Sequence, residues 1–173
     1  MSNVDLSRVP EYYHRYISLA MNDDLPKAFE KHQTKLISFL KAIPKKKWDY
    51  RYAEGKWSIR EVAQHIIDAE RVFAYRALCF ARKDTTPLPS FDENIFAANS
   101  KAGNRSKKDL LKELRTIQRS SAQLFDSIDE EQLDQSGTAS GNPTYVKGIA
   151  YIVLGHALHH KNILEERYIK RKS

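Results

Sequence analysis

Residues 144–170 read TYVKGIAYIVLGHALHHKNILEERYIK, and this stretch decides the fold class. Its apolar residues recur every three or four positions, which is the spacing of a helix face that packs against a core. His156 and His160 fall on that face, one helical turn apart. Burying two imidazoles is costly unless they find partners, and neutral imidazole is the commonest metal ligand. The stretch therefore predicts a core helix with a candidate metal site, and hydrogen-bonded core histidines are the alternative.

Three more segments have the same helical periodicity, and residues rich in proline, glycine and polar side chains separate them. The four expected helices cover about 24–43, 59–82, 107–128 and 144–170. Pro26 lies in the first turn of the first helix, where proline is favoured. Ser58 and Glu61 have the spacing of a capping box at the start of the second. Ser106 and Thr144 are the expected caps of the third and fourth.

These four segments predict an all-α fold, a four-helix bundle, as one domain over residues 1–173. Short extra helices are expected at 11–20 and 91–98. The segments 83–90 and 136–143 are expected to be loops, because they carry proline or are rich in glycine, serine and asparagine. The connections are longer than a minimal up-and-down bundle needs, which allows a crossover connection.

The composition is that of an ordinary globular protein, with 41% hydrophobic residues and a formal net charge of +7. The first ten residues lack the apolar run of a signal peptide, and no stretch is apolar enough for a transmembrane helix. Cys79 is the single cysteine and is expected to be a buried thiol, so we expect a cytoplasmic protein. The basic residues are scattered apart from clusters at 45–47 and 170–172, which argues against nucleic acid as a partner.

A third histidine, His65, borders the apolar face of the second long helix. If that helix packs beside the fourth, His65 meets His156 and His160. Three imidazoles leave coordination positions open to water or substrate, which is the layout of a catalytic metal site. The other histidines have no such partner: His14 and His32 are expected at the surface, and His159 is expected to be exposed or to support the site.

Several stretches together resemble the DinB/YfiT-like superfamily of metalloproteins, over about Tyr12 to Tyr168. They read GKWSIREVAQH at 55–65, DAERVFAYR at 68–76, PLPSFDE at 87–93, GHALHH at 155–160 and NILEERY at 162–168. The resemblance implies a four-helix bundle with a divalent metal ion held by His65, His156 and His160. It also implies a homodimer acting on a small-molecule substrate, either as a metal-dependent hydrolase or as a transferase that uses a low-molecular-weight thiol.

The two reactions place different demands on the residues around the metal. A hydrolase activates water and gains from a general base, for which Glu61 and Asp92 are candidates. Glu61 also fits the capping box, and Asp92 also fits a turn or helix start. A transferase holds its thiol cofactor as the thiolate, and Arg76 could bind a carboxylate of that cofactor, although a surface ion pair is the alternative. Histidine-only sites suit zinc, nickel, iron or copper, and zinc or nickel is expected here. A non-catalytic, metal-stabilised or stress-related bundle is the remaining hypothesis.

Overall fold

The computed structural model describes residues 4–170 and contains four long helices. They are α2 (Leu25–Ala42), α3 (Ile59–Ala81), α5 (Lys107–Asp126) and α7 (Val146–Ile163). The predicted all-α four-helix bundle is confirmed. Residues 1–3 and 171–173, which include Arg171 and Lys172 of the basic tail, lie outside the described part. Within residues 4–170, no helix is both long and apolar enough to span a membrane.

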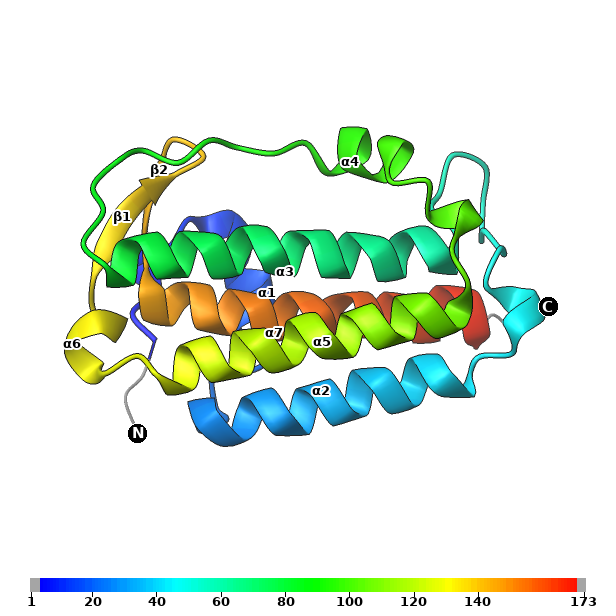
Figure 1. Cartoon of the computed structure of the whole chain (residues 1–173), viewed down its shortest axis with the longest axis horizontal. Helices are drawn as coiled ribbons and strands as arrows, with labels where there is room; N and C mark the ends of the chain where they lie inside the picture. The colour runs from blue at the N-terminus through cyan, green and yellow to red at the C-terminus, as the bar shows by residue number, and fades with distance from the viewer. Residues whose placement is uncertain (1–3, 171–173) are drawn as a thin grey trace.

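The connection between α3 and α5 runs the length of the bundle. Helices α2 and α7 point one way, and α3 and α5 point the other way (Figure 1). Helix α3 packs against α7 and α5, and α2 packs against the same two helices. Because the neighbours α3 and α5 are parallel, the chain from 82 to 106 must return along the outside, and it carries α4 (Glu93–Asn99) and the turn η4 (Ala102–Asn104). The crossover connection is thus present.

Local hydrogen bonds explain where the long helices begin. Ser58 accepts from the backbone N–H of Glu61, and the Glu61 carboxylate accepts in return from the backbone of Ser58, so α3 has the predicted capping box. Ser106 caps α5 in the predicted place by accepting from the backbone of Asp109. Pro26 lies at the start of α2, where its missing N–H costs nothing.

Short elements complete the fold. They are η1 (Leu6–Arg8), η2 (Glu11–Tyr13), α1 (His14–Ile17), η3 (Lys45–Lys47), α6 (Glu130–Leu133) and the π-helical segment η5 (Leu164–Ile169), which continues α7. Helix α1 packs on α7. The short helix predicted at 11–20 is therefore present only as η2 and α1, and the one predicted at 91–98 is α4.

The segment predicted as a loop at 136–143 is instead the first part of a β-hairpin. Strand β1 (Ser136–Ala139) pairs antiparallel with β2 (Asn142–Tyr145). The two turn residues, Ser140 and Gly141, have φ angles of +54° and +74°. A two-residue hairpin turn of this kind needs positive φ at both positions, which glycine adopts without strain.

The hairpin also moves the start of the fourth helix. Thr144 pairs with Gly137 inside the strands, and Tyr145 occupies the N-cap position of α7 without a side-chain capping bond. The prediction that Thr144 caps α7 was therefore wrong. The backbone of Thr144 is part of the strand pairing, so the helix begins only after it, at Val146.

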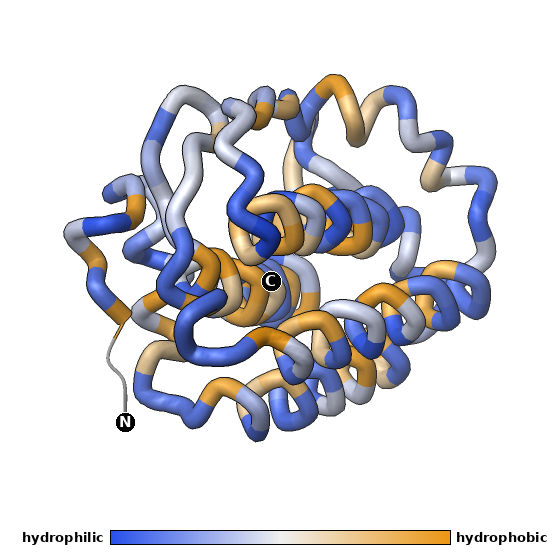
Figure 2. The backbone as a smooth tube through the Cα atoms, turned by 60° about the vertical axis from the view of Figure 1, so that its left-hand side comes forward, coloured by the Kyte–Doolittle hydropathy of each residue, from blue (hydrophilic) through white to orange (hydrophobic). Residues whose placement is uncertain are grey.

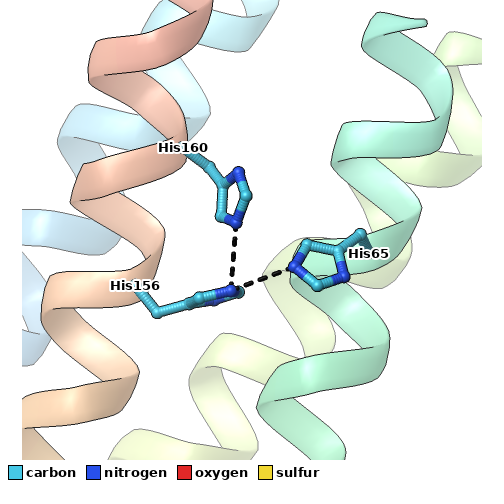
Figure 3. A group of neighbouring side chains, drawn as sticks. All are labelled: His65, His156 and His160. Carbon is cyan, nitrogen blue, oxygen red and sulfur yellow. Dashed lines mark hydrogen bonds between the residues drawn. The ribbon is translucent and has the colours of Figure 1, made fainter. Parts of the chain in front are cut away.

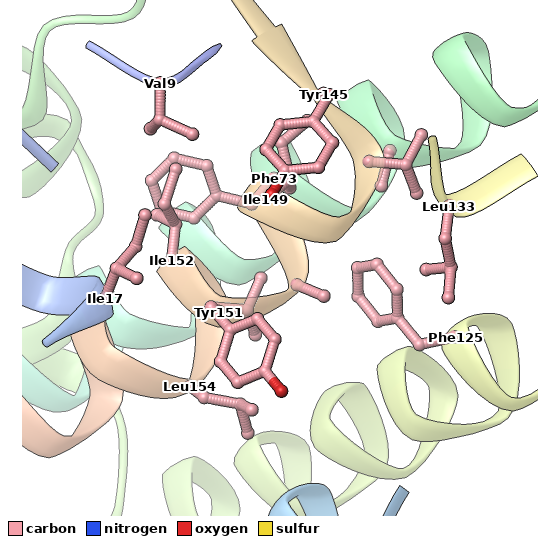
Figure 4. Close-up of a cluster of buried hydrophobic side chains, with 14 of the residues drawn as sticks. Val9, Ile17, Phe73, Phe125, Leu133, Tyr145, Ile149, Tyr151, Ile152 and Leu154 are labelled. Atoms are coloured by element: carbon pink, nitrogen blue, oxygen red, sulfur yellow. The ribbon is translucent and has the colours of Figure 1, made fainter. Parts of the chain in front are cut away.

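The core consists of two clusters of buried apolar side chains, one toward each end of the bundle. Figure 2 shows apolar and polar residues recurring along the long helices, as expected when one face of each is buried. The first cluster, part of which is drawn in Figure 4, includes the first half of α7 and the second half of α3. Cys79 is buried within it, as predicted.

Candidate metal centre

Three histidines converge between α3 and α7 (Figure 3). The Nε2 atom of His156 lies 3.0 Å from Nε2 of His65 and 3.0 Å from Nε2 of His160. The ligand nitrogens of all three lie within 4.8 Å of one another. The structure thus brings together the three residues that the sequence singled out as candidate ligands.

Helix geometry explains the convergence. His156 and His160 are one turn apart on α7, so both imidazoles project from one face. His65 projects from the second turn of α3, after the cap at Ser58. Because α3 and α7 pack closely side by side, the three rings meet at one point.

Burial keeps these imidazoles neutral near pH 7. Burial lowers the pKa of His65 to about 4. It also lowers the pKa of His156 and of His160 well below the ordinary value, and the neighbouring imidazoles lower both further. A neutral imidazole offers one nitrogen lone pair, which is the form that binds a metal ion.

The donor set fits a divalent metal ion. Without a metal ion, the three neutral imidazoles cannot all be well hydrogen-bonded to one another. Nε2 of His156 faces Nε2 of both His65 and His160, but in a neutral ring it carries at most one hydrogen. A divalent ion bound by all three nitrogens would satisfy each lone pair, and the 3.0 Å separations of the two pairs that include His156 are short enough for one ion to bridge them. No carboxylate belongs to the cluster within residues 4–170, so the site consists of imidazole alone.

Aromatic rings surround the cluster. The ring of Trp57 lies 4.8 Å from that of His65. Tyr16 of α1 meets His156 edge-on at 5.4 Å and lies 5.0 Å from His159. His159 is half-buried beside the cluster and is not a member of it. Trp57 lies in the stretch 55–65, which points to the family but gives this residue no role. Tyr16 lies in none of the stretches that carry the resemblance, so the sequence alone does not place it at the site.

The two carboxylates predicted as general bases have other partners. Glu61 accepts hydrogen bonds from the backbone and hydroxyl of Ser58 and from Arg51. Burial alone would raise the pKa of Glu61, but the bonds from Arg51 and Ser58 hold it below its ordinary value. Asp92 caps α4 by accepting from the backbone of Asn94 and Ile95. The capping interpretations of both residues are confirmed, and their catalytic roles stay predictions.

Arg76 forms no surface ion pair with any residue in the range 4–170. It is buried and donates to the backbone oxygen of Pro89 at 2.8 Å and to Oγ of Ser140 at 2.9 Å. These bonds tie the crossover connection to the tip of the β-hairpin. The guanidinium is therefore occupied in holding loops together, and binding of a thiol cofactor by Arg76 stays a prediction.

Two of the remaining histidines are placed differently from the expectation. His32 is 6% exposed, and its Nε2 lies 2.7 Å from a carboxylate oxygen of Asp23, so its assignment to the surface was wrong. His14 is partly buried and its Nε2 bonds to the backbone oxygens of Leu6 and Val9. The partners of both histidines lie before the helix that carries the histidine, so the spacing of residues within that helix could not predict these contacts.

Fold and site together define a class: a four-helix bundle with a candidate three-histidine metal centre between two of its helices. The model of the DinB superfamily matches residues 28–164, and the chain belongs to that superfamily.

Known proteins agree with this assignment. A protein of Oceanobacillus iheyensis named "Putative metal-dependent hydrolase OB0413" is 30% identical over 111 residues, which are 64% of this chain. The matched part spans 63% of that relative's length, less than two thirds.

Two solved structures share the fold. YfiT from Bacillus subtilis, described as "a probable metal-dependent hydrolase with an unusual four-helix bundle topology", has a TM-score of 0.71 at 17% identity and covers 85% of this chain and 87% of its own. The DinB-like protein YjoA from Bacillus subtilis has a TM-score of 0.58 at 20% identity and covers 82% and 87%. At these identities the likeness shows the fold alone.

Proposed function

We propose that this chain binds one divalent metal ion through His65, His156 and His160 and acts as a metal-dependent enzyme on a small-molecule substrate. The convergence of the three Nε2 atoms within 4.8 Å is the observation that carries the proposal. The names of the Oceanobacillus relative and of YfiT, both given as metal-dependent hydrolases, support it.

The residues of the chain set what the site can do. A divalent ion bound there supplies a Lewis acid and lowers the pKa of a water or thiol that binds beside it. Burial keeps the imidazoles neutral, so each has a nitrogen lone pair available for a metal ion; these are the rings of His65, His156 and His160. The rings of Trp57 and Tyr16 pack against those of His65 and His156 and help to fix their orientation. Imidazole ligands suit zinc, nickel, iron or copper, and of these we expect zinc or nickel.

Hydrolysis and thiol transfer are both possible reactions at this site, and the hydrogen bonds of the two candidate carboxylates bear on the choice between them. Hydrolysis gains from a protein base, but the carboxylates of Glu61 and Asp92 are already engaged in helix caps. Attack by a low-molecular-weight thiol needs no such base, because the thiolate is itself the nucleophile and its proton leaves to solvent. The occupied carboxylates favour the thiol-dependent transferase as the second candidate beside the hydrolase.

Metal content tests the site directly. Elemental mass spectrometry of the gently purified chain should find about one zinc or nickel ion per chain. His65→Ala, His156→Ala and His160→Ala should each lose it, because two imidazoles hold a metal far less tightly than three. His159→Ala is the matched control, since it removes a neighbouring imidazole that is outside the cluster. Full metal content in His156→Ala would refute the assigned ligands.

Activity then separates the reactions. The metal-loaded chain is offered a panel of esters and amides, and in parallel a panel of thiols with alkyl or epoxide electrophiles. Turnover of the first panel supports the hydrolase, and turnover of the second supports the transferase. A large loss of thermal stability on chelation, together with no turnover of either panel, would support the non-catalytic, metal-stabilised bundle instead.

A further inference from the structure

Two exposed arginines near the histidine cluster have no acidic partner. Arg15 belongs to α1, and Arg167 belongs to the π-helical segment η5, which continues α7. Within residues 4–170, neither guanidinium forms an ion pair with a carboxylate. Their positive charges are therefore available to a ligand.

Tyrosine rings hold the guanidinium of Arg15 in place. Its Cζ atom lies 4.2 Å from the ring centroid of Tyr12 and 4.8 Å from that of Tyr16. It also donates to the hydroxyl of Tyr16 at 2.9 Å. Stacking on aromatic rings orients a guanidinium without neutralising its charge. Because a guanidinium has several N–H donors, it keeps some of them for a ligand after this bond.

The stacked guanidinium lies next to the candidate metal centre. The ring of Tyr16, on which it stacks, lies 5.4 Å from that of His156 and 5.0 Å from that of His159. Burial is the main cause that lowers the pKa of His156 and of His160, and the neighbouring imidazoles and the positive charge of Arg15 lower both further. A small molecule bound at the centre therefore has this guanidinium within reach.

Arg167 borders the same side of the cluster. It follows His159 by eight residues along α7 and η5, which is about two helical turns. Its guanidinium donates to the hydroxyl of Tyr52 at 3.2 Å and lies 5.6 Å from the centroid of that ring. Burial lowers the pKa of His159, and the charges of Arg15 and of Arg167 lower it further. Cations from both ends of the chain thus act on one imidazole beside the cluster.

The centre itself has no negative charge to offset these cations. Its three candidate ligands are neutral imidazoles, and no carboxylate within residues 4–170 belongs to the cluster. A divalent ion bound there keeps its full positive charge, which is then the largest local charge of the site. Two arginines beside it add to a positive potential that attracts anions. Arginine also binds a carboxylate through two parallel hydrogen bonds, which fixes its orientation.

We propose that the substrate of this centre carries a carboxylate, which Arg15 and Arg167 bind while the reacting end of the substrate lies at the metal ion. This inference deepens the proposed function and rests on it, because it needs a metal ion at the cluster. It applies to hydrolysis and to thiol transfer alike, since the carboxylate lies away from the reacting atoms. The two arginines then select anionic substrates over neutral ones.

Calorimetric titration of the full zinc-loaded chain with three matched probes tests the proposal. The probes are 6-mercaptohexanoate, 6-mercapto-1-hexanol and 6-amino-1-hexanethiol. Each brings a thiol to the metal ion on the same carbon chain, and they end in an anion, a neutral hydroxyl and a cation. The carboxylate probe should bind at least about fivefold more tightly than the alcohol, and the amine should bind most weakly. Because both arginines are exposed, raising the salt concentration should reduce this preference.

Charge-removing variants identify the residues. Arg15→Gln and Arg167→Gln should each weaken binding of 6-mercaptohexanoate about two- to fivefold, as expected for one exposed charge, and leave that of the alcohol unchanged. Arg15→Lys keeps the charge and should retain most of the preference, which a purely structural role of Arg15 does not predict. Arg115→Gln removes an exposed arginine of α5 and is the matched control, which should bind all three probes as the unmodified chain does.

The possible results separate this inference from the proposed function. One zinc ion per chain with equal affinity for the anionic and neutral probes would refute the inference and leave the metal centre intact. A full preference in both Arg15→Gln and Arg167→Gln would show that other residues bind the carboxylate. Equal weakening of the alcohol and the carboxylate in Arg15→Gln would show that Arg15 only supports the structure, and would refute its assigned role. A chain that binds no zinc would refute the centre and the inference together.

Discussion

Replacing Gly155 by alanine should destabilise the bundle and weaken the candidate metal centre. A Cβ atom at Gly155 would lie 1.8 Å from the backbone oxygen of Tyr16. That oxygen belongs to α1 and cannot rotate away as a flexible side chain could, so α1 and α7 would have to separate by about 1 Å or more. The absence of a side chain at Gly155 is what allows α1 to pack against α7 beside His156.

The size of the effect follows from two opposing terms. Forcing extra atoms into a well-packed contact costs about 1–3 kcal/mol or more, and a clash with backbone belongs at the upper end. Alanine is a better helix former than glycine by about 1 kcal/mol, which offsets part of that cost. We expect a net loss of about 2 kcal/mol, which for a chain of this length lowers Tm by about 4–8 °C.

Differential scanning calorimetry of the Gly155→Ala chain measures the loss. Gly103→Ala is the matched control, because a Cβ there would meet nothing within 4 Å. Zinc affinity should also fall in Gly155→Ala, since displacement of Tyr16 removes the ring that packs on His156. A Tm equal to or above that of the unmodified chain would show that the contact between α1 and α7 does not limit stability, and the reasoning would fail.

Three further predictions follow from single residues. Arg76→Leu leaves the oxygen atoms of Pro89 and Ser140 without their hydrogen-bond donor. Trypsin should therefore cleave the connection at 82–92 faster, and urea unfolding should show a loss of about 1–3 kcal/mol in the free energy of unfolding. An unchanged cleavage rate would contradict this. Burial raises the pKa of Glu70 to about 7 in the folded chain, so the folded state binds the extra proton and stability should fall as pH rises from about 4.5 to 7. Between pH 5 and pH 8 the unmodified chain should therefore lose roughly 2.5 kcal/mol relative to Glu70→Gln, and parallel curves would exclude this pKa. Light scattering after gel filtration should give twice the mass of one chain if the homodimer implied by family resemblance forms, and a monomer mass would exclude it.

Helical periodicity and capping predicted most of the fold. Ser58 with Glu61, and Ser106, are local signals whose hydrogen bonds involve residues three positions away, so they can be recognised without knowing the tertiary structure. The apolar spacing around His156 and His160 is equally local. These elements were therefore predictable almost to the residue.

The errors concern residues whose partners lie outside their own helix. The hairpin has strands of four residues, too short to show a clear alternation, and its turn depends on Ser140 at a positive φ. Arg76 bonds to Ser140, 64 residues away, and is buried in the core although charged residues are rarely buried. Propensity assigns such side chains to the surface, and only tertiary packing can move them inside.

The meeting of the three histidines depends on the crossover and not on periodicity alone. In an up-and-down bundle with short loops, the second and fourth long helices lie diagonally across the core. Here the connection from 82 to 106 returns along the outside, so that α3 and α5 are parallel and α3 becomes the direct neighbour of α7. His65 reaches His156 because of that exchange of neighbours. Arg76 fastens this connection to the β-hairpin through its bonds to Pro89 and Ser140.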